Sequence, residues 1–301
     1  MIDEYLHKEI SGNQVLMKTI ILTENKFNKL IKESNGFFDG CRELAIEIFN
    51  KIYENWKDRD NLTQRDYLMV PCEWASRGRI VILPTKVNVR AGYVYARHQV
   101  NGDTVICVNP IVIHEDESTF LPTLEHELTH AYEDSMRLRN GSSMDNAAMN
   151  LGYHKLFNYK FRGMSMEDDT IAKKDLANVL YWFTSFEQNA FFAAMFGKLI
   201  HGYGEPEDAN ECLEIIKGTR EYNGFSNSIY VAREILTKKT DKIIQNSLVI
   251  YANELTNMNF NSYNQLCKWL NYKADKLEIK MNEMVRKMVN RYFEMVDNDE
   301  I

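Results

Sequence analysis

Cysteine and proline are both scarce in this chain of 301 residues, with five of each. The odd number of cysteines and the lack of a CxxC pair argue against a disulfide framework and against a thiolate zinc cluster. We interpret the cysteines as reduced thiols; they are Cys41, Cys72, Cys107, Cys212 and Cys267. The low proline content, together with only 14 glycines, also excludes collagen-like and low-complexity proteins.

An excess of positive charge is missing too, since 36 Lys and Arg stand against 43 Asp and Glu, for a net charge of −7. No block of like charge is long enough for a nucleic-acid arm, so a DNA or RNA partner is not expected. The most apolar stretch, residues 176–200, is interrupted by polar side chains that include Asn178, Glu187 and Lys198. It therefore predicts a core helix and no membrane span.

The first residues, MIDEYLHKEISGNQ, are acidic where an export signal needs a basic segment followed by an apolar run. No such signal is visible, which favours a cytoplasmic location. Export by another route or packaging into a particle would leave the same pattern, so both stay open.

What the chain does contain is a globular composition, 45% hydrophobic and 26% charged. Residues 14–34 and 41–56 have apolar side chains at helical spacing. Three short extended runs follow, and the last two flank the hairpin signal Asn101-Gly102-Asp103; the runs are 79–84, 93–99 and 104–109. From Ser118 onward the period is helical again, with Ser118 or Thr119 as the N-cap.

These zones predict an α+β fold that is mostly helical, with a small mixed sheet before the helix that starts near Ser118 and a helical C-terminal subdomain. We expect three regions: a helical one over 1–75, the sheet and its following helix over 76–140, and a helical one over 141–301. The last region ends in an apolar stripe at steps of three or four, from Tyr263 to Met295. It predicts one long helix that packs on the protein's own core or, as the alternative, binds a partner helix.

The informative motif is HExxH, present as His126-Glu127-x-x-His130. On a helix, residues i and i+4 share a face, so both imidazoles can bind one Zn²⁺ while Glu127 points at the bound water. Zinc acidifies that water, and a carboxylate within hydrogen-bond reach takes its proton as the water attacks a carbonyl. The spacing thus predicts two metal ligands and a general base from one helical turn.

The segment from Thr123 to Tyr132 resembles the active-site helix of the zincin metallopeptidases, with uncharged residues around the motif and a hydrophobic residue at its end. The zincin branch with a third histidine six residues after the second is excluded, because Met136 occupies that place. A gluzincin-like arrangement, in which a later helix supplies a glutamate, remains. The resemblance implies an upper subdomain at 76–140 and a third-ligand helix in the region that follows.

Glu187 is the candidate for the third ligand, since it stands almost alone in an apolar segment, YWFTSFEQNAFF. A buried carboxylate there would cost several kcal/mol unless a cation or strong donors met it. Gluzincins often have an Asp four residues after this Glu to orient the first histidine, but Phe191 occupies that place. Another group must hold His126; the candidates are Asp134, Asn189 and Ser185. A solvated acid at a helix end is the alternative for Asp134.

Weaker candidates complete the site. A donor to the reaction's oxyanion could come from His154, His201 or Tyr203, although loop or surface roles fit each of them as well. The predicted strand at 104–109 precedes the HExxH helix, as does the edge strand that pairs with substrate in zincins. The alternative is an ordinary hairpin strand.

The sequence therefore predicts a zinc metallopeptidase acting on a protein or peptide, with Zn²⁺ held by His126, His130 and Glu187 and with Glu127 as general base. The alternative is a catalytically weak zincin-fold protein with a structural or interaction role.

Overall fold

The computed structural model describes residues 34–85, 91–94, 103–139, 171–202, 204–256 and 258–298. Contacts divide the chain into two units, Met1–Glu43 and Leu44–Ile301. Of the first unit, residues 34–43 are described, as the beginning of helix α3 (Ser34–Trp56). The predicted helix over 14–34 falls almost wholly outside the described residues. The sheet, the other helices and the candidate site belong to the second unit.

The sheet is mixed and has four strands in the order β1-β2-β4-β3. β1 (Leu68–Pro71) is antiparallel to β2 (Arg79–Pro84), which is parallel to β4 (Thr104–Val108). β3 (Ala91–Val94) is antiparallel to β4 and forms one edge. Along β2 every second side chain is buried, as the two-residue period of a strand requires. The expected α+β fold, with a small mixed sheet ahead of the helical part, is confirmed.

Three details of the sheet differ from expectation. β1 lies inside the region 1–75 that we expected to be helical, because a four-residue strand ending in proline leaves only a weak pattern. The strand predicted over 93–99 is observed at Ala91–Val94, and residues 95–100 are outside the described part. β4 is central, flanked by β2 and β3, so the segment 104–109 is not an edge strand.

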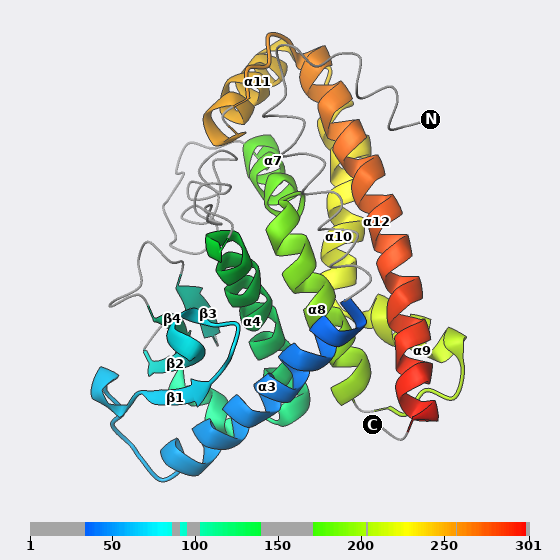
Figure 1. The fold of residues 1–301 in the computed structure, drawn as a ribbon. Helices are drawn as coiled ribbons and strands as arrows, with labels where there is room; N and C mark the ends of the chain where they lie inside the picture. Colours follow the sequence, from blue (N-terminus) through cyan, green and yellow to red (C-terminus); the bar gives the residue numbers. More distant parts are fainter. Residues whose placement is uncertain are drawn as a thin grey trace, which may run out of the picture. The chain divides into compact units, whose positions relative to one another are not determined.

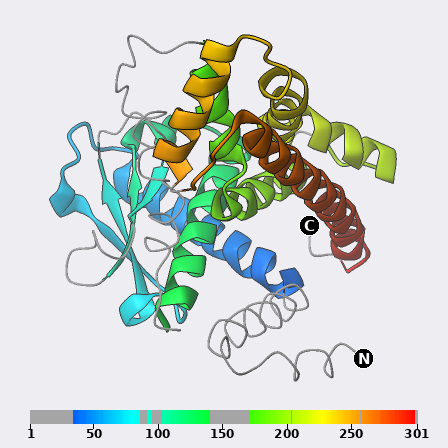
Figure 2. The ribbon, with the colours of Figure 1, turned by 90° about the horizontal axis from the view of Figure 1, so that it is seen from above.

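Helix α4 (Glu117–Arg139) carries the HExxH motif and lies between the sheet and the C-terminal helices (Figures 1 and 2). Its cap is Asp116, and neither Ser118 nor Thr119 serves as expected: Oδ1 of Asp116 accepts from the backbone N–H of Thr119 at 2.9 Å and from the hydroxyl of Ser118. Pro122 consequently falls in the second turn of the helix.

The apolar segment 176–200 forms two helices, α7 (Ile171–Trp182) and α8 (Ser185–His201), where we expected one. The break contains neither glycine nor proline. Instead, the Thr184 hydroxyl donates to the Leu180 carbonyl at 3.0 Å, and the side-chain amide of Gln188 donates to the Trp182 carbonyl at 3.4 Å. These bonds satisfy carbonyls that the end of α7 leaves open.

The remaining helices are α9 (Ala209–Gly218), α10 (Arg220–Tyr230), α11 (Lys242–Thr256) and α12 (Tyr263–Asp297), with a π-helical turn at Val231–Leu236. Short 3-10 turns occur at Gln64–Asp66, Ser76–Gly78 and Pro110–His114. α12 is a single helix of 35 residues, and most of the predicted stripe is buried, from Leu266 to Met295. The stripe packs within the chain, as its first interpretation expected.

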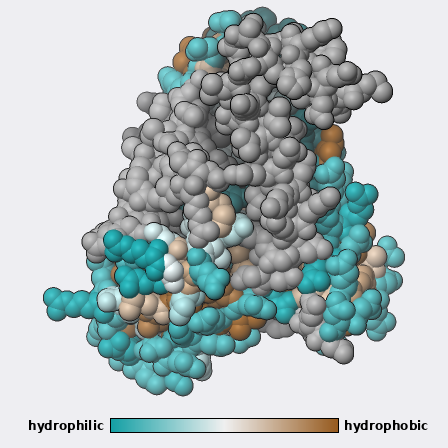
Figure 3. Space-filling model, viewed as in Figure 1, coloured by the Kyte–Doolittle hydropathy of each residue, from teal (hydrophilic) through white to brown (hydrophobic). Residues whose placement is uncertain are grey.

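The apolar side chains lie mainly in the interior, and the described surface in Figure 3 is mostly hydrophilic. Within the part of the chain that the structure describes, no helix has both the length and the apolar content needed to span a membrane.

Gly224 of α10 provides room for the indole of Trp182. A Cβ built at Gly224 would stand 2.2–2.7 Å from three ring atoms of Trp182. That indole stacks on Phe191 with centroids 4.3 Å apart, and the Phe191 ring lies 4.9 Å from the ring of His126. The small residue in α10 therefore sets the aromatic packing behind the HExxH helix.

Gly224→Ala should lower the free energy of unfolding by about 1–3 kcal/mol, because the methyl group displaces a buried, rigid ring. Gly218→Ala is the control: a Cβ there meets nothing within 4 Å, and the change should stay within about 1 kcal/mol. Urea unfolding of both variants measures the difference. Equal midpoints would show that Trp182 can shift without cost.

Candidate metal centre

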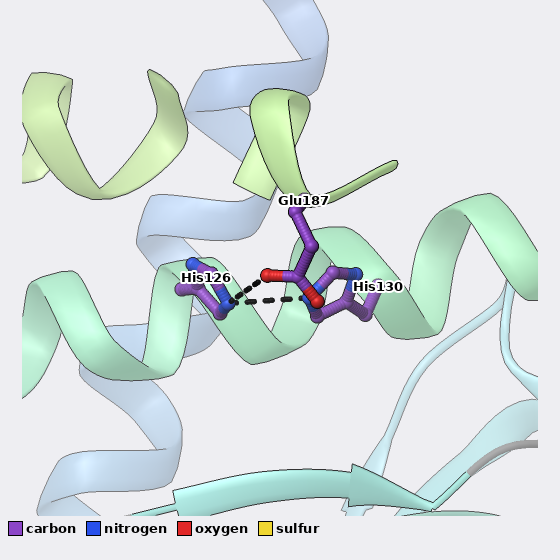
Figure 4. Close-up of side chains that lie close together, drawn as sticks. All are labelled: His126, His130 and Glu187. Atoms are coloured by element: carbon purple, nitrogen blue, oxygen red, sulfur yellow. Dashed lines mark hydrogen bonds and ion pairs between the residues drawn. The ribbon is translucent and has the colours of Figure 1, made fainter. Parts of the chain in front are cut away.

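Two helices bring three ligating side chains together. His126 and His130 project from one face of α4, and Glu187 projects toward them from the first turn of α8 (Figure 4). The two Nε2 atoms lie 3.2 Å apart. Oε2 of Glu187 is 3.7 Å from Nε2 of His126, and Oε1 is 3.6 Å from Nε2 of His130. The three residues that we selected from the sequence as metal ligands thus lie close together in the structure.

These separations fit a metal ion. Two ligands that bind a tetrahedral ion at 2.0–2.1 Å stand about 3.3–3.5 Å from each other. The two imidazole nitrogens, 3.2 Å apart, are close to that value, and with one oxygen of Glu187 the three ligand atoms lie within 4.8 Å of one another, so the three groups can together hold a metal ion. Two imidazoles and a carboxylate are donors typical of zinc and other first-row divalent metals.

The protonation of the site also suits a cation. The pKa of both imidazoles is lowered to about 3; burial is the main cause, and for His126 the nearby His130 acts in the same direction. Both rings are therefore neutral at pH 7, which is the form that binds metals. Glu187 is 2% exposed and occupies the first turn of α8, where the helix dipole and unpaired N–H groups favour a negative charge. The carboxylate has still lost nearly all contact with water, so a cation would stabilise it.

His126 is held by groups that the sequence did not single out. A hydrogen bond with the backbone of Ala190 raises its pKa, against the effect of burial. The side chain that follows, Phe191, packs against the imidazole at 4.9 Å between centroids. A main-chain group and an aromatic ring thus contact His126.

The structure places the three residues proposed to support His126 as follows. Ser185 is exposed. Asp134 is completely buried, so the alternative of a solvated acid at a helix end is wrong. Asn189 donates to Glu133 Oε1 of α4 at 2.5 Å and accepts from Lys280 Nζ of α12 at 2.7 Å.

Lys280 also donates to the amide oxygen of Gln188 at 3.2 Å. Burial lowers the pKa of Lys280 to about 8, while the charge of Glu133 raises it. These contacts tie α12 to the first turn of α8, next to Glu187, and tie that turn to α4. We call Glu133, Gln188, Asn189 and Lys280 the polar clamp.

A second polar contact joins α4 and α8 farther along. His201 Nε2 lies 3.2 Å from Glu125 Oε1, and a Cβ at Gly197 would stand 1.7 Å from Glu125 Oε2. His201 is 14 residues beyond Glu187 on α8, about 20 Å at the helical rise of 1.5 Å per residue. That distance counts against an oxyanion role for His201. The other two candidates, His154 and Tyr203, are outside the described residues.

Glu127 is half-buried on α4, beside the two histidines. Burial raises the pKa of the Cys107 thiol on β4, and the charge of Glu127 raises it further. The carboxylate is therefore near the sheet, and it is not one of the three grouped ligand side chains. The raised pKa also supports the view of Cys107 as an unreactive thiol.

Sequence reasoning missed Tyr181. Its hydroxyl donates to Oε2 of Glu187 at 2.9 Å, and both side chains are buried. A buried tyrosine generally needs a partner for its hydroxyl, but nothing in the spacing indicates which one, because the break between α7 and α8 brings the two residues together.

Comparisons with protein-family models, with curated proteins and with solved structures find no match to this chain.

A divalent metal ion should raise the midpoint of thermal unfolding. At a concentration 100 times Kd the stabilisation is about 2.7 kcal/mol, or roughly 5–10 °C for a unit of this size. Glu187→Gln should remove most of that shift, because it deletes a charged ligand. Glu221→Gln, which changes a carboxylate paired with Lys198, should keep it. Scanning calorimetry with and without metal is the measurement, and an unchanged midpoint with Zn²⁺, Co²⁺ and Mn²⁺ would contradict a metal site.

Proposed function

We propose that this protein is a zinc-dependent metallopeptidase in which His126, His130 and Glu187 bind the ion and Glu127 acts as general base. The observation that carries the proposal is the convergence of one ligand atom from each of three residues, all within 4.8 Å of one another, beside an HExxH glutamate that is not among them. Structural zinc sites usually have four protein ligands, whereas catalytic sites have three and leave a position for water. Within the described residues the group has three.

The chemistry follows from the chain's own groups. A bound zinc ion would lower the pKa of a water molecule and polarise the carbonyl that the water attacks. Glu127 would accept the proton of that water and pass it to the leaving amine. The two neutral imidazoles contribute no charge, so Glu187 supplies the one negative charge of the ligand set.

The substrate we propose is a peptide in extended conformation. β3 is the edge strand next to β4, and α4 lies alongside it. Among the described strands, none pairs with the other side of β3. A peptide could add there by main-chain hydrogen bonds, which would bring a carbonyl near the HExxH helix. β3 thus takes the role that we expected of residues 104–109.

Glu127→Gln tests the proposal. Zinc content should stay at that of the wild type because all three ligands remain, while hydrolysis of a mixed peptide library should fall at least 100-fold, as expected for loss of a general base. Glu117→Gln, at the exposed first residue of the same helix, is the control and should keep full activity.

Two results would contradict the proposal. Equal cleavage by wild type and Glu127→Gln would exclude this glutamate as the base. Zinc binding without cleavage of any peptide, under conditions that preserve the fold, would favour the catalytically weak alternative.

A further inference from the structure

The carboxylate of Glu187 has two oxygens in different surroundings. Oε2 accepts a hydrogen bond from the Tyr181 hydroxyl at 2.9 Å and lies 3.7 Å from Nε2 of His126. Oε1 lies 3.6 Å from Nε2 of His130. A phenol that donates to Oε2 uses one of its lone pairs and draws electron density from it. Oε1 is therefore the better metal ligand of the two.

Packing fixes the position of the Tyr181 hydroxyl. Tyr181 is 5% exposed, and its ring contacts Trp182 and Phe191 at centroid distances of 6.1 and 6.0 Å. Phe191 in turn contacts His126. The donor to Glu187 is thus anchored in the same aromatic group that supports the first histidine.

The polar clamp holds the two residues that follow Glu187. Lys280 donates to the side chains of Gln188 and Asn189. With these neighbouring side chains bound to α12 and one of its own oxygens bound to Tyr181 of α7, Glu187 has little freedom to rotate. Second contacts of this kind orient metal ligands before the ion arrives.

We propose that Tyr181 is a positioning residue for the metal centre: by holding Oε2, it makes Glu187 present Oε1 alone to the ion and prevents the carboxylate from binding through both oxygens. The proposal rests on the metal site proposed above. Binding through one oxygen would leave a coordination position of the ion available to water. Tyr181 would then affect catalysis through Glu187, without touching the substrate.

The test compares the wild type with Tyr181→Phe and with Tyr292→Phe, which removes a buried hydroxyl from α12. Co²⁺ is the probe, because its visible absorption is stronger in four-coordinate than in five-coordinate sites. In Tyr181→Phe, Co²⁺ affinity should fall about 10–100-fold, and the absorption should weaken as the freed carboxylate binds through both oxygens. Tyr292→Phe should match the wild type in both measurements.

A second comparison separates positioning from a general role in folding. In the Glu187→Gln background the carboxylate is gone, so adding Tyr181→Phe should change the residual Co²⁺ affinity by less than about twofold. An equal loss in both backgrounds would overturn the proposal, because it would show that Tyr181 acts through packing. Tyr181→Phe alone removes the hydrogen-bond donor of a buried carboxylate and could fold poorly for that reason. The double variant has a neutral amide at position 187, so it avoids this cost.

Two further outcomes are decisive. If Tyr181→Phe has the affinity and spectrum of the wild type, the positioning role is wrong and the metal site stands. If the wild type itself binds neither Co²⁺ nor Zn²⁺, the metal site and the role of Tyr181 both fall.

Discussion

The burial of one carboxylate constrains the rest of this structure. Glu187 is 2% exposed, and an ionised carboxylate removed from water costs several kcal/mol unless other groups replace the lost hydration. The N-terminal turn of α8 and the Tyr181 hydroxyl supply part of that replacement. A cation between the carboxylate and the two neutral imidazoles would supply the remainder. The break between α7 and α8 is what makes this arrangement possible, because an uninterrupted helix would offer neither a first turn at Glu187 nor a hydroxyl folded back from position 181.

The pairing of helices α4 and α8 brings Glu187 next to the two histidines. They run antiparallel, since Glu133 meets Asn189 near one end and Glu125 lies against Gly197 near the other. Polar contacts thus fix the pair on both sides of the histidines. The polar clamp also includes α12, whose Lys280 holds that long helix against the first turn of α8. Buried polar networks of this kind gain little net free energy but specify one relative placement of the helices.

Residue chemistry in the sequence identifies the candidate ligands, whereas the groups that contact them depend on tertiary structure. HExxH indicates two candidate ligands through the helical period. Glu187 stands out because burying a lone acid in an apolar segment is costly unless another group compensates its charge. The strand at 79–84 follows from its β-branched residues. The break between α7 and α8 at Phe183 and Thr184 cannot be predicted in this way, because it contains no glycine or proline. It is formed by tertiary contacts and by hydrogen bonds of side chains. The edge position of β3 and the pairing of Tyr181 with Glu187 are likewise set by packing between distant segments.

The absence of a match in the three comparisons and the presence of a candidate metal site are compatible for a physical reason. Binding a metal ion constrains a few side chains on two helices, and almost any sequence that keeps those helices paired can meet the requirement. The parts that hold His126 illustrate this freedom, because a backbone group at Ala190 and the ring of Phe191 stand where an acid is common. In the proposed peptidase, the choice of substrate would depend instead on the surfaces around the candidate site, above all on β3 and the face of α4 beside it. Those surfaces can diverge while the ligands stay, so the chemistry of this chain is more readily inferred than its target.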